Sequence, residues 1–119
     1  MSKSLYERLG GTAAIMQISS DLVDIHLNNP RIAARYADSD PVKVKHQVAT
    51  FFIAGTGGPD NYDGEDMRAA HTGMNIDNDE FVAVLDDALL ALEKHNVGQR
   101  EKEEVLYVLY SMKSDIVFV

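Results

Sequence analysis

The sequence contains no cysteine among its 119 residues. This absence excludes disulfides, thiolate zinc sites, iron–sulfur ligation and cysteine nucleophiles, so histidine, carboxylate and hydroxyl groups remain for any chemistry. Basic residues are also few, with 11 Lys and Arg against 19 Asp and Glu and a formal net charge of −8. Binding to nucleic acid or to an anionic membrane surface needs clustered basic residues, so we expect neither as a partner.

Long apolar runs are missing as well. No segment approaches the length needed to cross a bilayer, and the first eight residues lack the apolar stretch of a signal peptide. We therefore expect a cytoplasmic location. The length of the chain and its 45% share of hydrophobic residues predict one domain over residues 1–119, with a small core.

Apolar residues recur at helical spacing in four segments, in stripes that would each bury one helix face. The stripes comprise Ile15, Ile18, Leu22 and Ile25; Val44, Val48, Phe51 and Phe52; Phe81, Val84, Leu85, Ala88 and Leu92; and Val105, Leu106, Leu109, Met112 and Ile116. Alternation with a period of two is almost absent. We therefore predict an all-α fold.

Residues that favour helix N-termini precede three of the stripes. Thr12 is placed to cap the first helix, and Asp40-Pro41 combines an N-cap residue with proline at the first helical position. Asp77 or Asn78 can cap the third helix. These signals place the starts of the main helices.

The segment between Gly55 and Asn78 is unusual for a small helical domain. It is rich in Gly, Asp and Asn, and only a short helix over residues 65–72 is expected within it. Connections between helices usually have about two to eight residues, and longer ones are often functional. We therefore expect this segment to belong to a functional site.

His71 lies within this short helix. Met67, Ala70, His71 and Met74 are spaced i, i+3, i+4 and i+7, so the histidine shares an inward face with two methionines. One interpretation is a core histidine that donates to a backbone carbonyl. The other is a ligand, because one imidazole in an apolar cavity is what an axial haem site needs when the porphyrin supplies four nitrogens.

Three stretches of the chain carry a family resemblance. They are Leu5-Tyr6-Glu7-Arg8-Leu9-Gly10-Gly11, Gly57-Gly58-Pro59-Asp60-Asn61-Tyr62-Asp63-Gly64 and Met67-Arg68-Ala69-Ala70-His71-Thr72-Gly73-Met74. Over nearly its whole length the sequence resembles the truncated haemoglobins of group I. The resemblance implies a two-over-two helical sandwich over residues 1–119, haem b as the cofactor, and His71 as the proximal iron ligand.

The resemblance also implies further residues around the haem. Met67, Ile76 and Phe81 correspond to positions on the haem face or edge, and Phe52 to a gate in the apolar tunnel toward the iron. The positions near the haem propionates are occupied by Lys43, Tyr62 and Arg68. A plain core or surface role stays open for all seven side chains.

The distal side departs from the family pattern. Val23 stands where the resemblance predicts a tyrosine, Val44 and Val48 stand where polar groups are common, and Gln47 replaces a histidine that some members use as a sixth ligand. Tyr36 replaces the usual phenylalanine. Its phenol either donates to a gas ligand or stacks on the porphyrin with its hydroxyl outward.

We predict five-coordinate ferrous iron, because only His46, one position from Gln47, offers an alternative sixth ligand from this region. The predicted function is binding of diatomic gases at ferrous iron, for oxygen binding and transport or for nitric oxide handling. The alternative is a haem enzyme, either a nitric oxide dioxygenase or a weak peroxidase, for which a reductase could serve as a partner. A third alternative for the function is a helical interaction module without haem. A monomer is expected.

Overall fold

The computed structural model describes residues 3–119, which form six α-helices, two short 3-10 helices and no strand. The elements are α1 (Leu5–Arg8), α2 (Gly11–Leu27), η1 (Ala33–Tyr36), α3 (Pro41–Gly55), α4 (Met67–His71), α5 (Asn78–Lys94), α6 (Gln99–Tyr110) and η2 (Lys113–Asp115). The predicted all-α fold is confirmed. None of the helices in residues 3–119 has the length and apolar character required to span a membrane.

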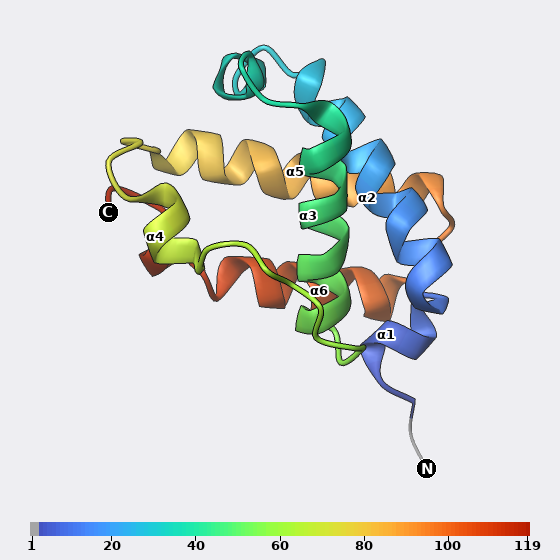
Figure 1. Cartoon of the computed structure of the whole chain (residues 1–119). Helices are drawn as coiled ribbons and strands as arrows, with labels where there is room; N and C mark the ends of the chain where they lie inside the picture. Colours follow the sequence, from blue (N-terminus) through green and yellow to red (C-terminus); the bar gives the residue numbers. More distant parts are fainter. Residues whose placement is uncertain (1–2) are drawn as a thin grey trace.

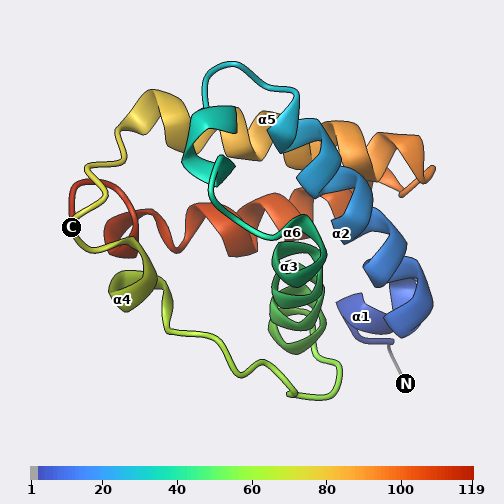
Figure 2. The same cartoon turned by 45° about the horizontal axis from the view of Figure 1, so that its top comes forward.

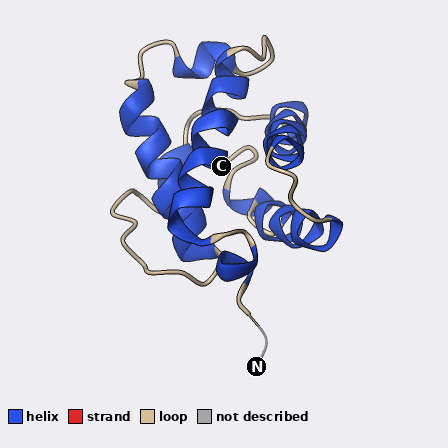
Figure 3. Ribbon diagram, turned by 90° about the vertical axis from the view of Figure 1, so that its right-hand side faces the viewer, coloured by secondary structure: helices blue, strands red, loops and turns tan. Residues whose placement is uncertain are grey.

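Two pairs of helices form two layers. α2 packs against α3, and this pair lies across the pair formed by α5 and α6 (Figure 1). Figure 3 shows the two layers side by side, with one pair seen nearly end-on. The core between them contains Leu22 of α2, Ala88 and Leu92 of α5, and Val105 and Leu109 of α6. Burial of each large aliphatic side chain stabilises the fold by about 1.5–3 kcal/mol.

Two of the predicted helix starts are confirmed. Asp40 caps α3, with its Oδ1 accepting from the Val42 N–H at 3.0 Å and Pro41 at the first helical position. Asp77 caps α5 through a capping box, in which its Oδ1 accepts from the Glu80 N–H at 2.8 Å and Glu80 Oε1 accepts from the Asp77 N–H at 3.2 Å. These reciprocal bonds satisfy backbone donors that the helix itself cannot pair.

The predicted cap of the first helix is wrong. α2 begins at Gly11 and its N-cap is Gly10, whose φ of 108° lies in the left-handed region that favours glycine. Thr12 lies inside the helix, and its hydroxyl pairs with the Tyr6 hydroxyl at 2.6 Å. The fourth helix is also shorter than the stripe predicts, because α6 ends at Tyr110 and Ile116 follows the 3-10 turn η2.

The long segment between α3 and α4 runs as an open loop along the edge of the molecule (Figure 2). Tyr62 anchors it, because its hydroxyl donates to the Glu65 carbonyl at 2.6 Å and its ring packs edge-on against Phe51 at 5.6 Å. On the other side of α4, the Phe118 N–H donates to the Ile76 carbonyl at 3.0 Å. The short helix is thus held between the loop and the last residues of the chain.

Candidate functional site

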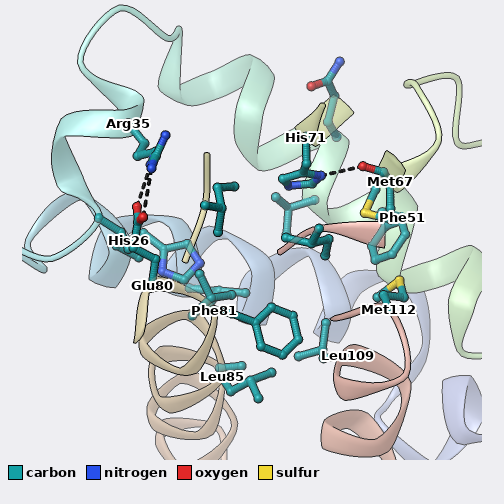
Figure 4. Close-up of a pocket in the computed structure, with 18 of the residues that line it drawn as sticks. His26, Arg35, Phe51, Met67, His71, Glu80, Phe81, Leu85, Leu109 and Met112 are labelled. Carbon is teal, nitrogen blue, oxygen red and sulfur yellow. Dashed lines mark hydrogen bonds and ion pairs between the residues drawn. The ribbon is translucent and has the colours of Figure 1, made fainter. Parts of the chain in front are cut away.

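A cavity of about 330 Å³ lies between the helix layers, a volume in the range of sites for small organic ligands. Its wall is mostly apolar and includes Phe51, Phe81, Leu85 and Met112, with His71 of α4 on one side (Figure 4). Residues from α2 to α6 contribute to this wall, so the whole fold positions the site.

α4 directs His71 toward the cavity. Asp66 starts this helix, with its Oδ1 accepting from the Ala69 N–H at 2.8 Å, and His71 is its last residue. His71 Nδ1 lies 2.7 Å from the Met67 carbonyl oxygen, to which it donates (Figure 4). The lone pair is then on Nε2.

This arrangement fits an axial haem ligand. Histidines that bind metals commonly donate their second ring N–H to a backbone carbonyl, which fixes the ring and its tautomer. The Met67 carbonyl takes this role for His71. A core histidine would make the same bond, but His71 also lines a cavity with a mostly apolar wall. Porphyrin iron needs one such imidazole and an apolar surrounding, and both are present.

Six other residues predicted from the resemblance line the same cavity, namely Tyr36, Val48, Tyr62, Met67, Ile76 and Phe81. Phe52 lines it too, and also borders a small apolar cavity of about 20 Å³ toward the core. This place between two cavities is compatible with the predicted tunnel gate. Contact of these residues with a cofactor stays a prediction.

Lys43, Val44 and Arg68 do not line the cavity. Lys43 is exposed on α3, and Val44 lies one turn before Val48, so on this side of α3 the wall begins with Gln47 and Val48. Arg68 Nε pairs with Asp115 Oδ1 at 3.2 Å, toward η2. The rest of the predicted apolar stripe of α3, Val48, Phe51 and Phe52, does line the cavity.

On α2 the predicted tyrosine position does not face the cavity. Val23 is buried at 1% exposure but does not line the cavity, whereas Leu22 and His26 do. The tyrosine position of the family is thus filled by a side chain that packs elsewhere. On this side the cavity is bordered by Leu22, His26 and Gln47.

Four polar residues in the wall were not predicted as site residues, namely His26, Arg35, Gln47 and Glu80. The Gln47 side chain forms no hydrogen bond with other residues in the described part of the chain, so its amide is a free donor. The sequence showed only that Gln47 is not histidine. Its position one turn before Phe51 was the signal that could have placed it in the wall.

Arg35 and Glu80 form an ion pair at one end of the cavity (Figure 4). Arg35 Nε lies 2.6 Å from Glu80 Oε2, and Arg35 Nη1 donates to the Met74 carbonyl at 2.6 Å. The guanidinium holds the pKa of the Glu80 carboxyl below its usual range. This contact joins η1 to the start of α5 and to the segment after α4.

His26 lies in the last turn of α2 and is only 4% exposed. Its Nδ1 lies 2.7 Å from Asp87 Oδ2, and its ring stacks on Tyr36 with centroids 5.8 Å apart and an interplanar angle of 8°. Burial lowers the pKa of His26 against the opposing effect of Asp87. Burial and the charge of Asp87 raise the pKa of Tyr36, which keeps its phenol protonated.

His95 is the C-cap residue of α5. Its Nε2 pairs with Asp21 Oδ2 at 2.6 Å, which connects the end of α5 to α2. Spacing along one helix could not reveal a partner 74 residues away in the sequence.

Comparisons with known proteins agree with this geometry. The family model described as bacterial-like globin matches residues 4–118. The group 1 truncated haemoglobin GlbN of Synechocystis is 33% identical over 109 residues, covering 88% of each chain. The group 1 truncated haemoglobin of Tetrahymena pyriformis is 26% identical over 115 residues, covering 97% of this chain and 95% of the relative.

Solved structures match the fold closely. The Fe(III) form of Tetrahymena pyriformis truncated haemoglobin superposes with a TM-score of 0.95 at 26% identity, covering 98% of this chain and 100% of that one. The 2/2 haemoglobin of a Synechococcus species, solved in the cyanomet state with covalently attached haem, gives a TM-score of 0.90 at 28% identity and covers 97% and 98%. The chain therefore belongs to the bacterial-like globin family and is a homologue of the group 1 truncated haemoglobins.

Proposed function

We propose that this globin holds haem b through His71 and binds diatomic gases at ferrous iron. The observation that carries the proposal is the placement of His71, with Nδ1 donating to the Met67 carbonyl and its ring lining a cavity whose wall is mostly apolar. Ferrous porphyrin iron supplies reversible binding of oxygen, nitric oxide and carbon monoxide. The protein residues orient the imidazole, limit access of water and provide hydrogen bonds to the ligand.

Tyr36 is the first candidate for the hydrogen bond to a gas ligand. Its hydroxyl forms no hydrogen bond with other residues of the described chain, and stacking on His26 fixes the plane of its ring. The raised pKa of the phenol keeps the proton available for donation. Gln47 offers a second donor from α3.

We propose oxygen binding and transport or nitric oxide handling, in the cytoplasm and as a monomer, and the acidic charge of −8 supports a soluble protein without nucleic-acid contacts. The enzymatic alternative, nitric oxide dioxygenation or weak peroxidase activity, needs a group that moves protons in the cavity. The buried pair of His26 and Asp87 is the feature that favours it.

The absorption spectrum of the purified protein tests the haem assignment. We expect a Soret band that shifts when the reduced protein is exposed to carbon monoxide. In a His71→Gly variant, added imidazole should enter the vacated space and restore the spectrum of a protein with one axial imidazole. His46→Gly is the matched control, because His46 is exposed and lies outside the cavity wall. A protein without a Soret band after supply of haem, or a His71→Gly spectrum identical to wild type without imidazole, would contradict the proposal.

A further inference from the structure

A hydrogen-bonded pair formed by His26 and Asp87 lies in the wall of the cavity. His26 Nδ1 is 2.7 Å from Asp87 Oδ2, and both residues are 4% exposed. Asn29 Nδ2 donates to both oxygens of the same carboxylate at 3.1 Å. The pair is therefore held by residues of two layers, with Asp87 on α5 and the other two side chains on or directly after α2.

The two members of the pair face different spaces. His26 lines the cavity that also contains His71 (Figure 4), whereas Asp87 lines a separate hollow between α2 and α5. The imidazole therefore spans the wall. Its Nδ1 contacts the carboxylate, and since His26 lines the cavity, Nε2 is the ring nitrogen left available to it.

The carboxylate fixes the proton of the imidazole. An ionised carboxylate only accepts hydrogen bonds, so Nδ1 of His26 must carry the hydrogen, and the neutral ring then has its lone pair on Nε2. Burial lowers the pKa of His26, which favours this neutral form near pH 7. Nε2 has no hydrogen-bond partner within residues 3–119. The cavity wall thus presents an unpaired basic nitrogen.

We propose that His26, oriented by Asp87, is the proton acceptor of the ligand cavity and assists weak protic acids that bind the iron as anions. This inference rests on the proposed haem function. Hydrogen cyanide, hydrazoic acid and hydrogen sulfide belong to this chemical class. The H–X bond breaks, its proton moves to Nε2 of His26, and the electron pair left on X is available to ferric iron. No atom changes its oxidation state.

Other charged and titratable groups around His26 do not duplicate this role. Tyr36 stacks on the imidazole and is protonated, so it donates rather than accepts. Arg35 and Glu80 neutralise each other in their ion pair. His71 has its own carbonyl partner on α4. Apart from His71, the proposed iron ligand, His26 is thus the group in the cavity wall that has a free lone pair to accept a proton.

A base in the cavity wall should affect ligands that carry an acidic proton differently from those that do not. Carbon monoxide and oxygen arrive without a proton to lose, so a base in the wall gives their association no assistance. Hydrogen cyanide is almost wholly undissociated at neutral pH and must lose its proton. A positioned base accelerates such a transfer by about 10²–10⁴-fold. His26 should therefore affect cyanide association far more than carbon monoxide association.

Stopped-flow binding of cyanide to the ferric holoprotein tests this. We expect the association rate at neutral pH to fall by about 100-fold in His26→Leu, the lower end of the range for a positioned base. Carbon monoxide association to the ferrous form of the same variant should change by less than about threefold, because no proton is transferred. His46→Leu is the matched control, since it makes the same change at an exposed histidine outside the cavity.

The pH dependence gives a second readout. Protonated His26 cannot accept a proton, so the wild-type cyanide rate should fall on acidification with a midpoint below 6.5, the ordinary pKa of histidine. This limb should be absent in His26→Leu and in His26→Gln, whose amide has no basic nitrogen. In Asp87→Asn the limb should move to lower pH, because the carboxylate no longer stabilises the imidazolium.

Nitrogen-15 NMR of the diamagnetic carbonmonoxy protein makes the inference testable without any variant. We expect the signal of His26 to show a protonated Nδ1 and an unprotonated Nε2. An Nε2–H tautomer at neutral pH would overturn the inference, even if the leucine variant failed to fold. Equal cyanide rates in wild type and His26→Leu, with a normal Soret band and carbon monoxide binding, would also overturn it and leave the haem function intact. Loss of the Soret band in wild type would instead contradict the haem function.

Discussion

Replacement of Tyr36 by phenylalanine tests the distal hydrogen bond most directly. The change removes one oxygen atom, and the remaining ring can keep its stacked position 5.8 Å from His26. Because the hydroxyl has no hydrogen-bond partner in the described chain, no bond within the protein is lost. The variant should therefore fold with nearly unchanged stability. Any change in ligand kinetics should then come from the loss of the hydrogen bond between the phenol and the ligand.

The expected magnitude follows from one hydrogen bond. A typical hydrogen bond contributes about 1–1.5 kcal/mol net, and 1.4 kcal/mol corresponds to about a factor of ten in an equilibrium constant. If the phenol donates to oxygen, the oxygen dissociation rate of Tyr36→Phe should rise about tenfold. Carbon monoxide is a weaker hydrogen-bond acceptor, so its dissociation rate should change much less.

Stopped-flow displacement of oxygen by carbon monoxide measures these rates. Gln47→Leu is the informative companion variant, because Gln47 is the other free donor in the wall. An unchanged oxygen dissociation rate in Tyr36→Phe would refute the assigned role of the phenol. An increase in Gln47→Leu alone would assign the donor to α3, and increases in both would indicate that the two side chains share the ligand.

Three further predictions concern coordination and stability. The ferrous protein without added ligand should show a high-spin, five-coordinate spectrum, because His46 is exposed and outside the cavity wall; a low-spin spectrum would contradict this. Asp77→Ala should lower the free energy of unfolding by about 1 kcal/mol in urea titrations, because it removes the cap of α5, and an effect no larger than that of an exposed Asp60→Ala control would contradict the role of the capping box. Arg35 lowers the pKa of Glu80, so their contact stabilises the fold above the unfolded-state pKa, near 4.5, and this contribution is lost as the pH falls through the lower folded-state value. The stability difference between wild type and Glu80→Gln should therefore shrink on acidification, and a constant difference would show that the ion pair contributes nothing.

The helices could be predicted from the sequence because their signals are local. Asp40-Pro41 and Asp77 have side chains that pair with N–H groups two or three residues away, so their effect depends little on the rest of the fold. Thr12 failed as a cap because Tyr6, packed beside it after the chain turns at Gly10, takes its hydroxyl. Periodicity also missed the end of α6 at Tyr110, because Met112 and Ile116 continue the apolar spacing beyond the helix.

The site could be predicted only where a pattern identified it. His71 and Met67 belong to a motif with a fixed spacing on one short helix, so the sequence placed them together. His26 and Asp87 are 61 residues apart in the sequence and meet only because α2 crosses α5. The rotation of α2 about its axis also decided which residue faces the cavity, and a rotation of one position exchanges Val23 for Leu22.

The exchange of polar groups in the wall has a chemical consequence. A tyrosine at position 23 would have brought a donor to α2, whereas this chain brings an acceptor there in His26 and places its donors on η1 and α3, in Tyr36 and Gln47. Donors stabilise a ligand on which negative charge develops, and an acceptor assists a ligand that must lose a proton. Because donors and an acceptor line the same cavity, no single substitution should change the binding of all ligands equally. Tyr36→Phe should change the release of oxygen, and His26→Leu should change the entry of hydrogen cyanide. A common effect of both variants on both ligands would instead indicate that the stacked pair acts only by shaping the cavity.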